Sequence, residues 1–389
     1  MTGHAAGDFS AVDSIQMARA LELAARGLNT TDPNPRVGCV LVSHDHVVGE
    51  GWHVRAGEPH AEVLALQAAA GQTHGATAYV TLEPCCHTGR TPPCADALIA
   101  TGIGRVVCAS VDPNPRVAGG GIERLRAAGI TVTTGILGTE ARALNVGFFS
   151  RFERGRPFIR LKMAMSLDGR TAGAGGGQTW ISDSASRADV QIWRARSSAI
   201  LTGAGTVRAD DPHLDVRLTY GPWVRQPLRV VLDTELTSAP TAKIFRDAHA
   251  LIFAAADAPD RQGGVVGSAG GTVGTGGGAV GTGGEAIRIE RVPRSGRGLD
   301  LRAVVERLAA LEINELFVEC GARLAGAFLE AELVDELILY VAPHFLGLDA
   351  APLAALHGLG APNELPKFEY RDVTLLQNDV RLVLTPLGD

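Results

Sequence analysis

The sequence comprises 389 residues, of which 46% are hydrophobic and 20% are charged, and its formal net charge is −6. This length exceeds one ordinary hydrophobic core and predicts two domains, whereas the negative charge and the lack of a long apolar run exclude general nucleic-acid and membrane partners. Six cysteines are too few for a disulfide framework and residues 1–8 lack a signal-peptide pattern, so we expect a cytoplasmic protein with reduced or metal-binding thiols.

Apolar segments of two periodicities alternate along the first half of the chain. Apolar runs predict strands over residues 37–42, 47–53, 76–82, 105–110 and 130–132. Helical spacing predicts helices over residues 9–27, 60–68, 94–99, 122–129 and 140–149. Because strands alternate with helices, we expect an α/β layer domain over residues 1–150.

A second α/β pattern follows a short linker at residues 154–157. It predicts strands over residues 158–166, 199–202, 228–233, 249–253, 315–319 and 336–341. It predicts helices over residues 185–196, 301–311 and 323–331. We therefore expect residues 151–389 to form a second α/β domain. Residues 263–284 are mostly glycine, bury too little apolar surface to become ordered, and are expected to be a flexible insertion without a catalytic role.

Four residues of the first half form a pattern typical of zinc-dependent nucleobase deaminases. His60, Cys85 and Cys94 offer one imidazole and two thiols, a ligand set that leaves one position on zinc open. Glu62 follows the histidine by two residues and, as a non-ligand, can carry protons between water and the departing amino group. One feature is unusual for deaminases at large, because eight residues instead of two separate the cysteines.

A structural zinc ion is the alternative, and such sites prefer four protein ligands. Cys86 or His87 offers a fourth ligand, but that site would leave Glu62 without a function. The other cysteines lie in apolar strands or at the end of one, and we expect them in the core: Cys39, Cys108 and Cys320. Six further histidines are expected in loops or on the surface: His44, His46, His53, His74, His213 and His249.

Longer stretches resemble the bifunctional deaminase–reductases of riboflavin biosynthesis. The matching segments are PNPRVG at 33–38, GWH at 51–53 with AGEPHAE at 56–62, and TLEPCCHTGRTPPC at 81–94. The last segment contains the eight-residue spacing that is usual in this family. Further matches are residues 112–115, 161–162, 166–170, 209–212, 318–321 and 334–337. Together they extend over nearly the whole chain outside the Gly-rich segment.

The resemblance implies two consecutive reactions. A cytidine-deaminase-like α/β/α domain would use one zinc ion to hydrolyse the 2-amino group of 2,5-diamino-6-(5-phosphoribosylamino)pyrimidin-4-one. A domain similar to dihydrofolate reductase would then use NADPH to reduce the ribosyl side chain of 5-amino-6-(5-phosphoribosylamino)uracil to ribityl. The implied partner is a small phosphorylated pyrimidine, and the many apolar strands are compatible with a homodimer.

The resemblance also implies roles for individual residues. His60, Cys85 and Cys94 would bind zinc, and Glu62 would shuttle protons. NADPH would contact Ala164, Trp180, Thr206, Asp210 and a phosphate loop made of Gly321, Ala322, Arg323, Leu324, Ala325, Gly326 and Ala327. The substrate would contact Gln178, Arg194, Leu214, Arg217 and Glu319. Gln178 replaces a small hydroxyl residue of the family, and the two arginines suit a ribose phosphate because a guanidinium binds phosphate oxygens in a fork.

Three other functions fit parts of the pattern. A nucleic-acid-editing deaminase shares the zinc set but needs basic and aromatic residues, whereas aromatic residues make up 5% of this acidic chain. A deaminase fused to a reductase-like domain that only binds ligand would release ammonia without consuming NADPH. A non-enzymatic zinc-stabilised scaffold would release no ammonia.

Overall fold

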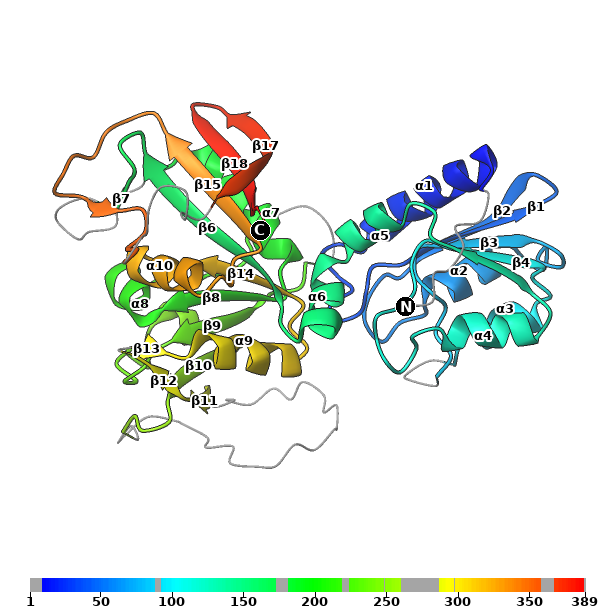
Figure 1. Ribbon diagram of the computed structural model, residues 1–389, viewed down its shortest axis with the longest axis horizontal. Coiled ribbons are helices and arrows are strands. Elements are labelled where there is room, and N and C mark those ends of the chain that lie inside the picture. The colour runs from blue at the N-terminus through cyan, green and yellow to red at the C-terminus, as the bar shows by residue number, and fades with distance from the viewer. Residues whose placement is uncertain are drawn as a thin grey trace. The chain divides into compact units, whose positions relative to one another are not determined.

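The computed structural model describes residues 9–87, 92–172, 181–218, 224–247, 249–259, 287–296, 298–357 and 367–387. These residues form two compact units, of which the first ends at Arg156 and the second begins at Pro157 (Figure 1). Arg225 also belongs to the first unit. The Gly-rich segment 263–284 lies outside the described residues, as do Gln178 and Trp180.

The first unit is built on a five-stranded sheet with the strand order β2-β1-β3-β4-β5 (Figure 1). Its strands are β1 (Gly38–Ser43), β2 (His46–Trp52), β3 (Thr77–Val80), β4 (Arg105–Cys108) and β5 (Thr131–Thr134). Its helices are α1 (Ala11–Ala25), α2 (Ala61–Ala68), α3 (Cys94–Ala100), α4 (Gly120–Ala127), α5 (Gly138–Leu144) and α6 (Val146–Arg154). β1 runs antiparallel to β2 and β3, whereas β3, β4 and β5 are parallel.

Neighbouring residues of each strand pack on opposite faces of this sheet. Cys39 and Leu41 belong to a buried cluster that includes residues of α2, α3 and α4. Val40 and Val42 belong to another cluster, which includes residues of α1 and α5. This period of two is expected for a strand covered on both faces. The predicted α/β/α layer architecture is therefore confirmed, and Cys39 and Cys108 are fully buried in it.

The helix predicted over residues 140–149 is in fact two helices, α5 and α6, which meet at Asn145. The φ angle there is −117°, outside the helical range. The Asn145 side chain accepts a hydrogen bond from the Arg36 backbone N–H (2.8 Å) and donates one to the Arg36 carbonyl (2.9 Å). These partners are 109 residues apart in the chain, so the local pattern contains no sign of the break.

The second unit contains a nine-stranded sheet with the order β11-β10-β9-β8-β14-β6-β15-β18-β17. Its strands are β6 (Phe158–Ser166), β8 (Ala199–Gly203), β9 (Leu228–Leu232), β10 (Ala250–Ala255), β11 (Arg288–Val292), β14 (Glu315–Glu319), β15 (Glu336–Ala342), β17 (Phe368–Leu376) and β18 (Asp379–Pro386). Its helices are α7 (Ser184–Arg196), α8 (Ala204–Asp210), η1 (Lys243–Phe245), α9 (Leu301–Ala310) and α10 (Ala322–Glu330). Short strand pairs join β7 (Arg170–Ala172) to β16 (Ala351–Pro352) and β12 (Arg294–Ser295) to β13 (Gly298–Leu299).

The sequence pattern predicted the buried strands of this unit but missed its exposed and short elements. Every strand from β11 to β15 in the sheet pairs in parallel, whereas β18 pairs antiparallel with β15 and β17. The β17–β18 hairpin was missed because most of β17 is exposed and lacks a buried face. Helix α8 has seven residues, too few to show a helical period. Within the described ranges, no helix is long and apolar enough to cross a membrane.

Candidate active sites

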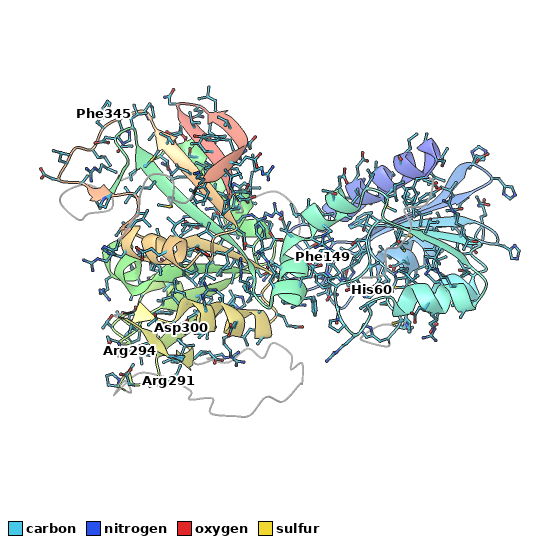
Figure 2. All side chains as sticks on the ribbon, viewed as in Figure 1. His60, Phe149, Arg291, Arg294, Asp300 and Phe345 are labelled. Atoms are coloured by element: carbon cyan, nitrogen blue, oxygen red, sulfur yellow. The ribbon has the colours of Figure 1, made fainter. Side chains whose placement is uncertain are left out.

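The three predicted zinc ligands converge in the first unit. His60, labelled in Figure 2, is the N-cap of α2. Cys94 is the first residue of α3, and Cys85 lies on the loop that follows β3. The Nδ1 atom of His60 lies 3.3 Å from the Cys94 Sγ and 3.7 Å from the Cys85 Sγ. All three ligand atoms lie within 4.8 Å of one another, which suits one small ion bound by nitrogen and sulfur.

The two thiols form a coupled pair beside the α3 N-terminus. The Cys94 thiol donates to the Cys85 sulfur and lowers the pKa of Cys85 to about 4, while the same interaction raises the pKa of Cys94. The backbone N–H of Cys94 also donates to the Cys85 Sγ (3.3 Å). The lowered pKa of Cys85 favours a thiolate at this position. This donor set fits zinc.

The close approach of α2 to the sheet places His60 at this site. A Cβ atom on Gly51 of β2 would lie 2.4 Å from the Ala61 carbonyl oxygen, so a side chain there would push α2 away. Among the described residues, the group able to hold a metal includes neither Cys86 nor His87. The geometry thus favours three protein ligands with an open position over a four-ligand structural site.

Glu62 is 3% exposed and lies on the first turn of α2, beside the ligand set. Burial raises the pKa of Glu62 to about 7, and the nearby Cys85 thiolate adds to the rise. A carboxyl group with a pKa near neutrality can both accept and release a proton at physiological pH. Its position and protonation behaviour suit the proton shuttle that the sequence predicts.

His53 lies in the loop after β2, as the sequence predicts, but it is buried: it is 3% exposed and packs edge-on against His60 with ring centroids 5.1 Å apart. Its Nδ1 donates to the Pro59 carbonyl (3.2 Å), which leaves Nε2 to accept from the Asn34 amide (3.0 Å). Burial lowers the pKa of His53. The signal was present in the sequence, since His53 ends the GWH segment directly after β2.

The loop after β4 brings a buried carboxyl group near the same site. Asp112 is 8% exposed, and burial, together with the negative charges of Glu83 and Cys85, raises its pKa to about 7. Its Oδ1 accepts from the Asn114 backbone N–H (2.8 Å). Residues 112–115 resemble the family segment, but no role for Asp112 follows from the sequence alone.

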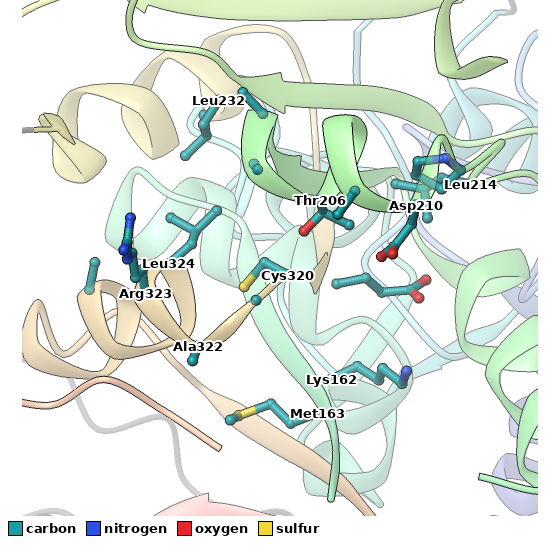
Figure 3. Close-up of a pocket in the computed structure, with 18 of the residues that line it drawn as sticks. Lys162, Met163, Thr206, Asp210, Leu214, Leu232, Cys320, Ala322, Arg323 and Leu324 are labelled. Carbon is teal, nitrogen blue, oxygen red and sulfur yellow. The ribbon is translucent and has the colours of Figure 1, made fainter. Parts of the chain in front are cut away.

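The second unit contains a cavity of about 1940 Å³, large enough for a dinucleotide and a second ligand (Figure 3). Most of the predicted cofactor and substrate residues line it: Ala164, Thr206, Asp210, Gly321, Ala322, Arg323, Leu324 and Ala327 for the cofactor, and Arg194, Leu214, Arg217 and Glu319 for the substrate. Cys320 packs half-buried against the hydrophobic core of this unit and also lines the cavity. In Figure 3, Lys162 and Arg323 appear on opposite sides of Cys320.

Two predicted cofactor residues do not line this cavity. Ala325 is fully buried on the inner face of α10, and Gly326 of the same helix faces the segment that follows β16. A Cβ atom on Gly326 would lie 2.0 Å from the Ala355 carbonyl oxygen. Gly326 thus allows close packing of α10.

Two helix N-termini open into the cavity. Gly203 and Gly321 are the N-caps of α8 and α10, and neither helix has a side chain that caps its free N–H groups. Both glycines line the cavity, and the strands that precede them, β8 and β14, are parallel neighbours. Uncapped N–H groups at one sheet edge suit the phosphates of a dinucleotide. The residues present therefore fit NADPH.

An ion pair occupies the other part of the cavity. The Arg194 Nε and Nη2 atoms donate to the two carboxylate oxygens of Glu319 at 2.6 and 3.0 Å. Burial alone would raise the pKa of Glu319, but the Arg194 guanidinium outweighs it and holds the pKa below its ordinary value. The fork of Arg194 is thus bound to a carboxylate at the cavity wall. Arg217, whose side chain is 64% exposed, forms an ion pair with Asp215 (3.5 Å).

Lys162 is a residue that the sequence analysis did not assign. It lies on β6 directly opposite Glu319 of β14 and lines the cavity. Burial lowers the pKa of Lys162, although Glu319 opposes this shift. The strand register therefore brings an amine and a carboxylate together at the proposed substrate end.

Comparison with known proteins assigns both units. Residues 11–110 match the family model of the cytidine and deoxycytidylate deaminase zinc-binding region, and residues 157–382 match that of the RibD C-terminal domain. The riboflavin biosynthesis protein RibD of Escherichia coli is 46% identical over 382 residues, which cover 96% of this chain and 99% of that protein. The chain belongs to the RibD family.

Other RibD proteins agree with this assignment. The Haemophilus influenzae protein is 43% identical, with 98% of this chain and 99% of that protein covered. The solved structure of Acinetobacter baumannii RibD (form 1) has a TM-score of 0.85 at 42% identity and covers 97% of this chain and 99% of that chain. The Thermotoga maritima deaminase/reductase structure has a TM-score of 0.80 at 31% identity, with the same two coverages.

Membership of the RibD family decides among the competing hypotheses. The chain is a bifunctional enzyme of riboflavin biosynthesis, with a zinc-dependent deaminase and an NADPH-dependent reductase that act on small molecules. The predicted fold of both parts is confirmed by the RibD structures. A zinc scaffold without activity and a nucleic-acid-editing enzyme are no longer needed to explain the ligand set.

Proposed function

We propose that residues 1–150 deaminate and residues 151–389 reduce the same phosphorylated pyrimidine in sequence. The observation that carries this assignment is that each unit holds one complete set of groups for its reaction. The first has the convergent imidazole and thiols beside Glu62, and the second has Lys162 and Glu319 in a cavity of dinucleotide size. The two family matches, at residues 11–110 and 157–382, support the same division.

In the first unit, the proposed reaction is hydrolysis of the 2-amino group of 2,5-diamino-6-(5-phosphoribosylamino)pyrimidin-4-one. His60, Cys85 and Cys94 would hold zinc, which lowers the pKa of a coordinated water toward neutrality and so supplies a nucleophile. Glu62 accepts one proton of the attacking water and donates it to the ring nitrogen. It then transfers the remaining hydroxyl proton of the tetrahedral carbon to the amino group, so that the C–N bond breaks, a C=O bond forms and ammonia departs. His53 fixes the orientation of the His60 ring by packing against it.

In the second unit, the proposed reaction is reduction of the ribosyl side chain of 5-amino-6-(5-phosphoribosylamino)uracil. The starts of α8 and α10 would hold NADPH, which would supply the hydride for C1 of the sugar after the ring C–O bond has opened. Arg217 binds the substrate phosphate, the Lys162 ammonium donates to the substrate and supplies the proton that accompanies the hydride, and the Glu319 carboxylate accepts hydrogen bonds from the substrate. Arg194 holds the Glu319 carboxylate in place through two hydrogen bonds.

A coupled assay on the purified full chain tests both assignments. Ammonia release from the diaminopyrimidine phosphate is measured first, and the absorbance of NADPH is then followed after its addition. We expect ammonia release followed by NADPH consumption. The Glu62→Gln variant, supplied with already deaminated substrate, should still oxidise NADPH. If it does not, while its fold is intact, the two sites are not independent and the division of activities is wrong.

The second unit also offers a surface for a homodimer. Among the strands that the structure describes, β17 pairs only with β18 and forms one edge of the nine-stranded sheet. Tyr370, Val373 and Leu375 of β17 are 63%, 61% and 71% exposed. An apolar edge strand pairs readily with a second copy of itself around a twofold axis. Sedimentation of the native chain and of the Val373→Lys variant tests this, and an unchanged native mass in the variant excludes β17 as the interface.

A further inference from the structure

Glu83 makes four hydrogen bonds to backbone N–H groups on a neighbouring segment of the first unit. Its Oε1 accepts from Gly121 (2.9 Å) and Ile122 (3.1 Å) at the start of α4. Its Oε2 accepts from Gly119 (2.9 Å) and Asp112 (3.2 Å). The side chain is 3% exposed and no proposed step of the deamination uses it. A buried carboxylate with four donors is a strong and directional contact.

This carboxylate lies two residues before the proposed zinc ligand Cys85. The α4 N-terminus also presses against the intervening residue, because a Cβ atom on Gly121 would lie 1.9 Å from the Pro84 carbonyl oxygen. On its other side, Cys85 is held by α3, where the Cys94 N–H donates to its sulfur (3.3 Å) and the Ala95 N–H donates to its carbonyl (3.1 Å). The loop that carries Cys85 is thus fixed between the N-termini of α3 and α4.

The same carboxylate also fixes the loop after β4. Asp112 donates its backbone N–H to Glu83 and uses its side chain to accept from the Asn114 N–H (2.8 Å). Three of the free N–H groups at the α4 N-terminus are satisfied by Glu83, so this helix start has no capacity left for a substrate phosphate. The N-terminus of α4 therefore serves a contact within the first unit.

We propose that Glu83 is a positioning residue of the deaminase, which holds Cys85 in the geometry that zinc requires. The inference rests on the proposed zinc site. Glutamine is the sharpest substitution, because its amide oxygen can still accept but its NH₂ group would face two backbone donors. Groups that orient metal ligands from the second layer typically change metal affinity by about 10–100-fold. We expect Glu83→Gln to weaken zinc binding by a factor in this range.

The test measures zinc affinity by competition with a chromophoric chelator, and the visible spectrum of the cobalt(II)-substituted full chain. Glu123→Gln is the matched control, since Glu123 is an exposed acid on the first turn of the same helix. We expect native affinity and spectrum in Glu123→Gln, and weaker binding with an altered cobalt spectrum in Glu83→Gln. NADPH binding by the second unit should be equal in all variants and verifies their integrity.

A merely structural role predicts a different result. Glu83→Gln would then lower the melting temperature of the first unit but keep native zinc affinity and cobalt spectrum below the transition, and this outcome overturns the proposal. If Glu83→Gln does not fold, Glu83→Asp decides, because it keeps the charge on a shorter side chain. Several-fold weaker zinc binding in Glu83→Asp supports positioning, and native affinity overturns it. A native chain that binds no zinc at this site refutes the zinc assignment itself.

Discussion

Replacing Arg194 by methionine tests how the reductase unit holds its buried carboxylate. The side chains of Arg194 and Glu319 are 10% and 12% exposed, and two hydrogen bonds join them. Methionine keeps much of the volume but removes the charge, so Glu319 stays buried without its main partner. Removing one member of such a pair costs about 3–5 kcal/mol. We expect the unfolding free energy of the second unit to fall by about this amount at neutral pH.

The loss should become smaller as the pH falls. In the native chain the pKa of Glu319 is lowered, so its contribution is fully present above the unfolded-state pKa of about 4.3 and is lost as pH falls through the folded-state value. Without Arg194, burial raises the folded-state pKa of Glu319 instead. The folded variant then binds a proton more readily than the unfolded chain, and acidification toward the unfolded-state pKa stabilises it.

Urea unfolding at several pH values measures this, with tryptophan fluorescence as the signal because Trp193 precedes Arg194 on α7. Urea is uncharged and leaves the ion pair unscreened. The matched control is Arg288→Met, which removes a surface arginine that is 45% exposed and pairs with Glu290. An exposed pair contributes about 0–1 kcal/mol. A loss below about 1 kcal/mol in Arg194→Met, or one that grows on acidification, refutes the account of a buried pair.

Three further predictions concern the deaminase unit. Glu62→Gln should retain stoichiometric zinc and lose ammonia release by about 10²–10⁴-fold, with Glu123→Gln as control, and near-native release excludes the proton shuttle. Cys85→Ala should lose zinc but should still oxidise NADPH when it is supplied with deaminated substrate. Cys86→Ala is the control and should keep its zinc. Loss of zinc from Cys86→Ala would show that Cys86 is a fourth ligand. Gly51→Ala places a Cβ atom 2.4 Å from a carbonyl oxygen of α2 and should destabilise the first unit by about 1–3 kcal/mol in thermal unfolding; native stability would show that α2 moves freely.

The sequence by itself determined the order of elements and the composition of the metal site. His60 and Glu62 lie at the start of one helix, and Cys85 and Cys94 follow a buried strand and begin the next helix. These positions can be predicted from local sequence, because a spacing of a few residues determines which side chains lie together at the end of a helix or strand. The alternation of apolar strands and helices predicted both α/β units for the same reason.

Only the tertiary structure decided which other polar residues serve the sites. Lys162 faces Glu319 because β6 and β14 pair in register across 157 residues of chain, and the pairing of Arg194 with Glu319 spans 125 residues. The burial of His53 and the four hydrogen bonds of Glu83 likewise depend on elements distant in sequence. The local sequence around a charged or polar residue looks the same whether its side chain is solvated or bound to a partner. Its partner is set by strand register and helix packing, which local periodicity does not specify.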